Sequence, residues 1–236
     1  THSDLIEAAT QAGKAVMCEK PVDLSLERAR ACLKAVSATG RPVMIGFNRR
    51  FDPSFAAIRD SLAAGQIGKA ELLSVTSFDP APPPVDYIKV SGGMFRDMMI
   101  HDFDLVRFYL GKDEPAKIIA SGSNISDKRF DKIKDFELAS TIIRSRAGVQ
   151  CIITNSRHCS FGYDQRIELF GSKGMLISEN KRQNETSLYS AQSTSNKSPL
   201  LNFFIERYKD AYKNQLKDLS LIHISEPTRR TPISYA

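Results

Sequence analysis

The chain has 236 residues, enough to bury a hydrophobic core in one or two domains. Its hydrophobic content of 42% and charged content of 25% are typical of a soluble globular protein. No apolar run is long enough to span a bilayer and no signal-peptide pattern opens the chain, so the sequence does not favour a membrane protein. The net charge of +6 is spread along the chain rather than clustered, so the sequence does not favour a nucleic-acid-binding protein either.

Helix and strand patterns alternate at the start of the chain. Ser3 is a plausible cap for a short helix that ends at Gly13, and a second amphipathic helix is predicted over residues 25–39. Brief apolar runs over residues 15–18 and 43–46 have the length of buried strands. This order predicts part of a parallel α/β sheet, in which ligands bind beyond the carboxyl ends of the strands.

The pattern then changes to that of an α+β domain. Asp52 is a predicted cap for a helix ending near residue 64, and a strand over 70–78 and a proline-rich loop over 80–90 follow it. Further strand-like runs with turns between them predict an antiparallel sheet, over residues 118–122, 136–144, 149–155, 163–170 and 174–178. A polar loop over 181–198 precedes a last helix predicted over 200–219.

The rest of the chain is organised around the stretch from Ser91 to Gly111, which is predicted to be a turn followed by one helix. Asp97 and His101 are four residues apart, so they should lie side by side on that helix. Asp97 would then orient the imidazole ring and raise its pKa, and His101 would accept a proton. The spacing leaves open a second interpretation, a solvated polar stripe at a helix end.

Lys20 stands before Pro21 at the end of the first predicted strand. A lysine at that position can stabilise an oxyanion or alkoxide at the mouth of the sheet, and a cis bond before Pro21 would direct it there. The alternative is an ordinary exposed lysine.

Three segments together resemble the glucose–fructose oxidoreductase and inositol dehydrogenase (Gfo/Idh/MocA) family. They are the strand end 19–21, the segment 46–52, and the helix with Gly93, Asp97 and residues 101–104. The resemblance implies the C-terminal part of a Rossmann-like parallel sheet, followed by an open-faced, mainly antiparallel sheet domain with helices on one face. The expected division is residues 1–48 for the dinucleotide-binding part and 49–219 for the substrate-binding and oligomerisation part.

The resemblance also implies an activity, the NAD-dependent oxidation of a secondary hydroxyl of a cyclic polyol. The expected reaction converts myo-inositol to 2-keto-myo-inositol, while another sugar as substrate and NADP as cofactor stay open. His101 would be the general base, Asp97 its support, and Lys20 the group that binds the reacting oxygen. By the same resemblance, Arg49 and Tyr163 would bind polyol hydroxyls, and Glu19 and His2 would lie near the cofactor.

The chain departs from the family pattern at both ends. It contains no Gly-x-Gly-x-x-Gly turn with an acidic ribose-binding residue, so it is expected to be a fragment whose activity belongs to the parent enzyme. Residues 220–236 show no helical or strand period and include Pro227, and they are expected to form an irregular, non-native tail.

Other features bear on partners and compartment. Apolar residues on both sides of the strand 149–155 suggest an outer sheet face that meets a partner subunit, and hence a homo-oligomer. Four cysteines without metal-binding spacing are expected to be reduced, which favours the cytoplasm. Two alternatives from other classes of protein stay open. One is a metal hydrolase, although neighbouring helix positions point the side chains of His101 and Asp102 apart, so they do not converge easily on one metal ion. The other is a non-catalytic binding or scaffold protein.

Overall fold

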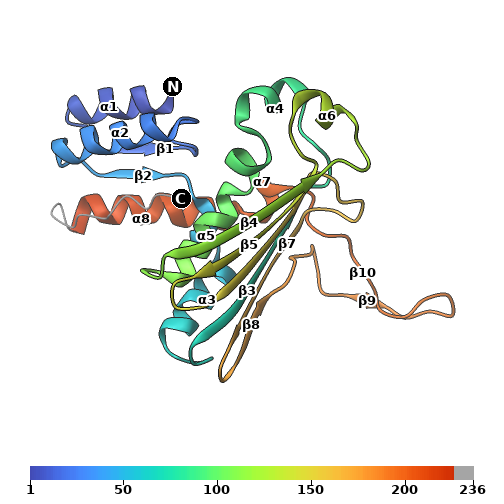
Figure 1. The fold of residues 1–236 in the computed structure, drawn as a ribbon. Helices are drawn as coiled ribbons and strands as arrows, with labels where there is room; N and C mark the ends of the chain where they lie inside the picture. The colour runs from blue at the N-terminus through green and yellow to red at the C-terminus, as the bar shows by residue number, and fades with distance from the viewer. Residues whose placement is uncertain (226–236) are drawn as a thin grey trace.

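The computed structural model describes residues 1–225 and has two parts that lie side by side (Figure 1). The first part consists of α1 (His2–Gln11), β1 (Val16–Cys18), α2 (Leu26–Thr39) and β2 (Val43–Ile45). β1 and β2 pair in parallel, with Val16 opposite Val43. Two parallel strands joined through a helix are the Rossmann-like arrangement that the sequence predicted.

Local signals set the ends of the first helices. Thr1, rather than the predicted Ser3, is the N-cap of α1, and its hydroxyl donates to Asp4 in the first turn. Ser3 is instead buried inside α1. Ser25, predicted as the first residue of the second helix, is instead the N-cap of α2, and Gly40 ends that helix in a left-handed conformation with φ of +65°.

The second part contains most of the chain. Its elements are η1 (Asn48–Phe51), α3 (Pro53–Ala63), β3 (Ala70–Phe78), α4 (Val85–Ser91), η2 (Met94–Met98), α5 (Ile100–Leu110), β4 (Pro115–Ser123), α6 (Arg129–Ile133), β5 (Leu138–Ser145), β6 (Gln150–Ser156), β7 (Asp164–Gly171), β8 (Gly174–Ser178), β9 (Ser187–Leu188), β10 (Asn196–Lys197), α7 (Phe204–Arg207) and α8 (Lys209–Ser225). Asp52 accepts hydrogen bonds from the backbone of Ser54 and Phe55, which confirms it as the cap of α3.

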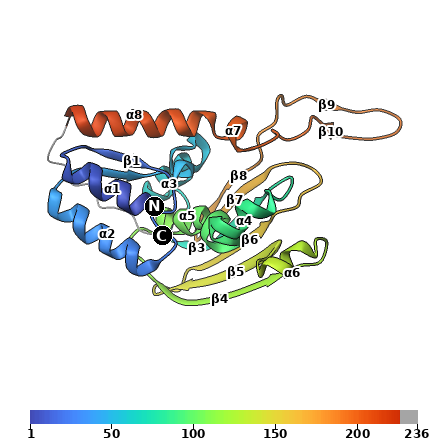
Figure 2. The same cartoon turned by 90° about the horizontal axis from the view of Figure 1, so that it is seen from above.

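Six strands form one sheet in the order β4-β5-β6-β3-β7-β8. β3 and β6 pair in parallel, and the other neighbouring strands are antiparallel, as in the mainly antiparallel sheet that was predicted. Buried and exposed residues alternate along β5, β6 and β7, so one face is covered and the other is open. Figure 2 shows α3 and α5 on the covered side of the sheet.

The central helix is not continuous. Residues Met94–Met98 form a π-helical turn, in which the amide of Met99 donates to the carbonyl of Met94 at 2.9 Å, and α5 follows it. Gly92 and Gly93 precede the turn with φ of +97° and +71°, and a Cβ on either would lie within 2.9 Å of neighbouring side chains. The predicted turn and the stop at Gly111 are thus confirmed, but the single helix is corrected to a π-turn joined to an α-helix.

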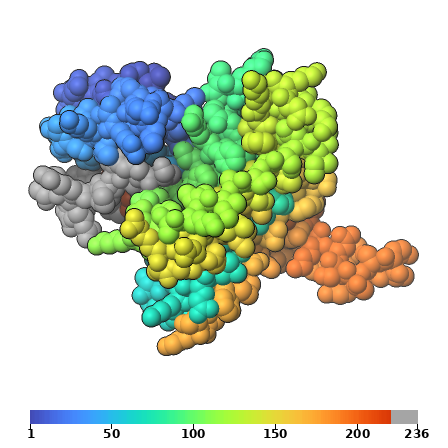
Figure 3. Space-filling view, in the orientation of Figure 1, coloured from blue at the N-terminus to red at the C-terminus, as the bar shows by residue number. Residues whose placement is uncertain are grey.

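The C-terminal region also differs from the prediction. The polar loop carries a short hairpin, β9–β10, which stands out from the body of the molecule (Figure 3). The last helix is split at Tyr208 into α7 and α8, and α8 continues to Ser225. The irregular tail is therefore corrected for residues 220–225, while residues 226–236 lie outside the described part of the chain.

α8 returns to the first part of the chain and joins the two parts. Gln215 is buried on this helix, and its side-chain amide donates to the carbonyl of Ile45 at the end of β2. Asn214 donates to the carbonyl of Phe51 in η1. None of the helices within residues 1–225 has the length and hydropathy needed to cross a membrane.

Candidate active site

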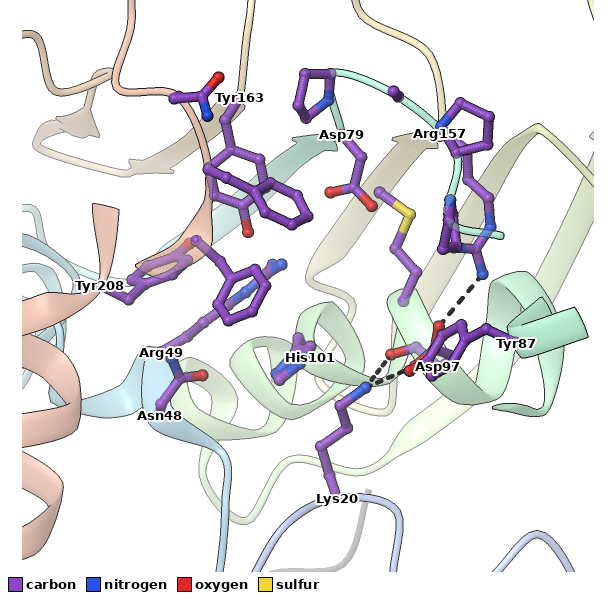
Figure 4. A pocket seen from close by; sticks show the side chains of 18 of the residues that line it. Lys20, Asn48, Arg49, Asp79, Tyr87, Asp97, His101, Arg157, Tyr163 and Tyr208 are labelled. Atoms are coloured by element: carbon purple, nitrogen blue, oxygen red, sulfur yellow. Dashed lines mark hydrogen bonds and ion pairs between the residues drawn. The ribbon is translucent and has the colours of Figure 1, made fainter. Parts of the chain in front are cut away.

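A cavity of about 930 Å³ opens at the junction between the two parts. Its wall is built from the end of β1, from η1, η2 and α5, from the segments after β3 and β6, and from α4, α7 and α8. Six of the side chains singled out from the sequence line it, namely Glu19, Lys20, Arg49, Asp97, His101 and Tyr163. Figure 4 shows five of them converging from segments that are far apart in the chain, namely Lys20, Arg49, Asp97, His101 and Tyr163.

Lys20 reaches the cavity from the end of β1, after which the Lys20–Pro21 bond is cis. Its ammonium group donates to the main-chain oxygen of Asp97 at 2.6 Å and to Oδ1 of the same residue at 2.9 Å. Both side chains are mostly buried, with 15% and 10% exposure. The first part of the chain thus supplies a cation that is held by the second.

Asp97 has three side-chain partners. Oδ1 also accepts a hydrogen bond from the hydroxyl of Tyr87 on α4 at 2.9 Å, and Oδ2 lies 3.5 Å from Nη2 of Arg157. Burial, with the charge of Asp97 beside it, raises the pKa of Tyr87 to about 12, so the hydroxyl stays protonated. Within residues 1–225 no hydrogen bond links Asp97 to His101, which corrects the expected Asp97–His101 pair.

The π-turn explains this correction. Asp97 belongs to η2 and His101 to the first turn of α5, so the side-by-side geometry of a regular α-helix does not apply. The carboxylate instead contacts three donors from other segments, Lys20, Tyr87 and Arg157. Asp97 therefore acts on Lys20 and not directly on the imidazole.

His101 lies in the cavity wall with its ring packed edge-on against Phe47, at 6.3 Å between ring centroids. Its Nδ1 atom is buried without a hydrogen-bond partner among the described residues. Burial, together with the charges of Arg49 and Lys20, lowers the pKa of His101 well below its usual value. The predicted rise in this pKa is thus reversed, and the imidazole is neutral at physiological pH and able to accept a proton.

Arg49 is a buried part of the cavity wall. Nη1 donates to Oδ1 of Asp102 at 2.5 Å and to Oγ of Ser77 at 2.8 Å. Asp102 also accepts from Nδ2 of Asn155 at 2.6 Å, and the guanidinium lies 5.6 Å from the ring centre of Tyr208. This network keeps Arg49 in place with donors left over to face a ligand.

Arg50 and Asp104 form a separate pair outside the cavity wall. Nε and Nη2 of Arg50 donate to the two carboxylate oxygens of Asp104 at 2.7 and 2.6 Å. Asp104 is buried, and this fork joins η1 to α5. Its role is to connect elements rather than to meet a ligand.

Aromatic rings close one side of the cavity. The ring of Tyr163 lies 5.4 Å from that of Phe203 and 6.2 Å from that of Tyr208, both edge-on. Burial, with Tyr208 beside it, raises the pKa of Tyr163 well above its usual value, so its hydroxyl is neutral and can donate and accept. In Figure 4 this hydroxyl points into the cavity.

The two residues expected near a cofactor lie in different places. Glu19 lines the cavity beside Gly46, where a Cβ would lie 2.7 Å from its Oε2 atom. His2 is in α1, and its Nδ1 lies 2.7 Å from the carbonyl oxygen of Pro21. His2 is not part of the cavity wall, so the structure does not bring it to the other residues.

Two charged residues of the wall, Asp79 and Arg157, were missed by the sequence analysis. Asp79 follows β3 and Arg157 follows β6, and the parallel register that sets Phe78 opposite Ser156 brings both to one edge of the sheet. The available signal was a charged residue directly after a buried strand. That signal does not say which strand ends share an edge, because the sequence predicted no strand order and so no parallel pairing of β3 with β6.

Asp79 has an unusual environment. Its side chain lines the cavity, and burial raises its pKa to about 6, although the charges of Arg157 and Arg49 partly offset this effect. Near neutral pH it is a carboxylate that loses its charge on mild acidification.

The residues that the structure describes include no cluster of three or more His, Cys, Asp or Glu able to hold a metal ion.

Comparison with family models gives two matches along the chain. Residues 1–47 match the model described as "Oxidoreductase family, NAD-binding Rossmann fold". Residues 55–177 match the model described as "GFO/IDH/MocA C-terminal domain", which accounts for more than half of the chain.

Known proteins similar to the chain include an inositol 2-dehydrogenase from Rhizobium meliloti, with 49% identity over 92% of the chain. The chain spans 65% of the length of that relative. A crystal structure of a myo-inositol dehydrogenase from Corynebacterium glutamicum is 45% identical with a TM-score of 0.90, covering 94% of this chain and 66% of that one. A scyllo-inositol dehydrogenase from Lactobacillus casei, crystallised with NAD(H) and scyllo-inositol, is 27% identical with a TM-score of 0.85, covering 99% and 69%.

Proposed function

Because the chain belongs to the Gfo/Idh/MocA family of oxidoreductases, we propose that the full-length protein containing it oxidises a ring hydroxyl of a cyclic polyol, with NAD as the hydride acceptor. The proposed reaction converts myo-inositol to 2-keto-myo-inositol, in line with the activity named for the relative from Rhizobium meliloti. The observation that carries the proposal is the meeting of Lys20, Asp97 and a neutral His101 in one cavity.

The residues present fit a bound nicotinamide cofactor. The cavity reaches the carboxyl ends of β1 and β2, where parallel sheets bind nucleotides, and Glu19 and Asn48 stand in its wall there. Gly46 leaves the Glu19 carboxylate room against the backbone, since a Cβ would collide with it. When bound, NAD accepts the hydride from the carbon that carries the reacting hydroxyl.

The chain's own residues manage the proton and the oxygen of that hydroxyl. His101 accepts the proton, which it can do because burial and neighbouring cations keep its ring neutral. Lys20 binds the same oxygen and stabilises the negative charge that develops on it. Asp97 orients Lys20 through the two hydrogen bonds between them.

The remaining wall residues hold the polyol ring. Tyr163 offers a hydroxyl that both donates and accepts, and Asp79 offers carboxylate oxygens to ring hydroxyls. Arg49 supplies donors from a fixed position because Asp102 and Ser77 hold its Nη1. Several donors and acceptors around one apolar-sided cavity suit a small ring with a hydroxyl on each carbon.

The test is oxidation by the purified full-length protein with NAD and a panel of myo-inositol, scyllo-inositol and common aldoses. NADH formation gives the rate, and mass spectrometry identifies the ketone. The proposal expects inositol to have the largest kcat/KM of the panel. A clear preference for an aldose would make the protein a sugar dehydrogenase of the same family, and no oxidation of any member would contradict the proposal.

The open sheet face supports a further part of this proposal, an assembly of identical subunits. Ile119, Ile142 and Ile152 lie directly opposite one another on β4, β5 and β6, with 52%, 44% and 37% exposure. On β7 and β8 the same face exposes Phe170, Met175 and Ile177. Ser74 and Glu168 separate these two apolar groups on the same face. Exposed apolar groups of this kind are stabilised when a second copy covers them.

A cytoplasmic location is also part of the proposal. The structure has Cys18, Cys32, Cys151 and Cys159 free, and a reducing compartment keeps thiols in that state. Cell fractionation with antibodies against the full-length protein tests it, and recovery in an extracytoplasmic fraction would contradict it.

A further inference from the structure

Arg157 is a deeply buried cation with few contacts. It follows β6, is 2% exposed, and lines the cavity with its guanidinium (Figure 4). Nη2 lies 3.5 Å from Oδ2 of Asp97, and Nε is buried without a hydrogen-bond partner among the described residues. The charge of Arg157 also acts on the nearby carboxyl of Asp79. Burying a charge without short hydrogen bonds to these carboxyl groups is costly, which indicates that Arg157 serves the cavity rather than the stability of the fold.

The carboxylate of Asp97 divides its contacts between its two oxygens. Oδ1 accepts from Lys20 and Tyr87, whereas Oδ2 faces Arg157. Lys20 has three ammonium protons, of which one goes to Oδ1 and one to the main-chain oxygen of Asp97. One proton is left for another acceptor.

We propose that Arg157 is a positioning residue for Lys20. By attracting Oδ2 of Asp97, Arg157 keeps that carboxylate bound to Lys20 through a single side-chain oxygen, so that the third ammonium proton stays available to the oxygen of the reacting hydroxyl. This inference rests on the proposed function, because it assumes that Lys20 binds that oxygen. Without the guanidinium, both carboxylate oxygens turn to Lys20, and the ammonium stabilises the developing alkoxide less well.

Steady-state kinetics of the full-length enzyme with myo-inositol and NAD provide the first test. Arg157→Met should lower kcat by about 10–100-fold, the scale of a misplaced catalytic group, with KM for inositol changed much less. Arg157→Lys should recover most of the lost kcat because it restores the charge. Arg129→Met, at an exposed arginine paired with Asp127, is the matched control and should keep normal kcat.

A double-mutant comparison separates positioning from a structural role. If Arg157 acts through Asp97, then Arg157→Met should change kcat by less than about twofold in an Asp97→Asn background. Equal effects of Arg157→Met in both backgrounds would overturn the proposal. A large rise in KM with unchanged kcat would also overturn it, because Arg157 would then bind substrate directly.

The role of Arg157 can also be tested without substrate, so that the result does not depend on the proposed activity. Competitive acetylation, read by mass spectrometry, reports how readily the Lys20 amine loses its proton and reacts. In Arg157→Met the tighter contact with Asp97 should make Lys20 several-fold less reactive than in the wild type. Unchanged reactivity overturns the positioning role, whereas reduced reactivity in a protein that oxidises no cyclitol supports it and refutes only the proposed function.

Discussion

Lys20 and Asp97 are 77 residues apart in the chain, yet the Lys20 ammonium donates to both the main-chain oxygen and the carboxylate of Asp97. The pair joins the end of β1 to the π-turn before α5. Because one residue comes from each part of the molecule, the contact places a cation where the Rossmann-like sheet meets the cavity of about 930 Å³.

The first prediction concerns Lys20. Replacing it with Met should lower kcat for inositol oxidation by about 10²–10³-fold, because one donor to the developing oxyanion is lost. Lys89→Met, at an exposed lysine paired with Asp86 on α4, should leave kcat unchanged and serves as the control. Equal kcat values for the two variants would remove Lys20 from the reaction.

The second prediction concerns Asp79 and pH. Its carboxyl has a pKa raised to about 6 by burial, so KM for the polyol should rise as pH falls through that value and the charged acceptor is lost. Asp79→Asn should raise KM at neutral pH by about 10–100-fold, the effect of losing hydrogen bonds to a charged group, and should make KM nearly independent of pH. Steady-state kinetics between pH 5 and 8 test this, with Asp60→Asn at an exposed site as the control. If KM of the Asp79→Asn variant still rises as pH falls, the prediction is contradicted.

The third prediction separates stability from activity. Asp104→Ala removes the buried carboxylate that holds Arg50, so the free energy of unfolding should fall by about 2 kcal/mol. Because the pair lies outside the cavity wall, kcat of the folded variant should stay near that of the wild type. Denaturant unfolding and steady-state rates check both, and a large loss of kcat with unchanged stability would place Asp104 in the reaction.

The fourth prediction concerns the open sheet face. The double substitution Ile142→Lys and Ile152→Lys places two charges side by side on it and should dissociate the full-length assembly, as seen by sedimentation velocity. Ile125→Lys, at an exposed residue outside the strands, is the control and should leave the assembly intact. A wild-type protein that sediments as a monomer at micromolar concentration contradicts the proposed oligomer.

Much of the fold follows from local signals in the sequence. Asp52, Gly92 and Gly111 mark helix ends and turns that the structure confirms, and short apolar runs mark β1 and β2. These features depend on residues within a few positions of one another, which is why they can be predicted. Local signals do not predict that Lys20 contacts Asp97, and that expectation came from the family pattern that contains both motifs.

What could not be predicted depends on contacts between distant segments. Two of the three side-chain partners of Asp97 are Tyr87 and Arg157, and no spacing along the predicted helix points to them. The π-turn over Met94–Met98 lies in a segment whose sequence has an ordinary helical period, so the sequence predicted one continuous helix there. The parallel pairing of β3 with β6 brings Asp79 beside Arg157, and strand order is set by packing of the whole sheet rather than by either strand.

The pH dependence expected of His101 changes with the structure. A pKa raised by Asp97 would make the rate climb through and above neutral pH, but the buried ring has a lowered pKa instead. The imidazole of His101, which we propose as the base, is therefore already neutral at pH 7. We expect kcat to fall only when pH drops well below the usual histidine value of about 6.5.

The proposed role of His101 is tested most directly by the kcat of His101→Ala in the full-length enzyme with saturating inositol and NAD. We expect a loss of about 10²–10⁴-fold, the usual contribution of a general base, with partial recovery when imidazole is added. His158→Ala, at an exposed histidine outside the cavity wall, should keep the wild-type rate. A His101→Ala enzyme that keeps nearly normal kcat and the wild-type pH profile would contradict the assignment of His101 as the base.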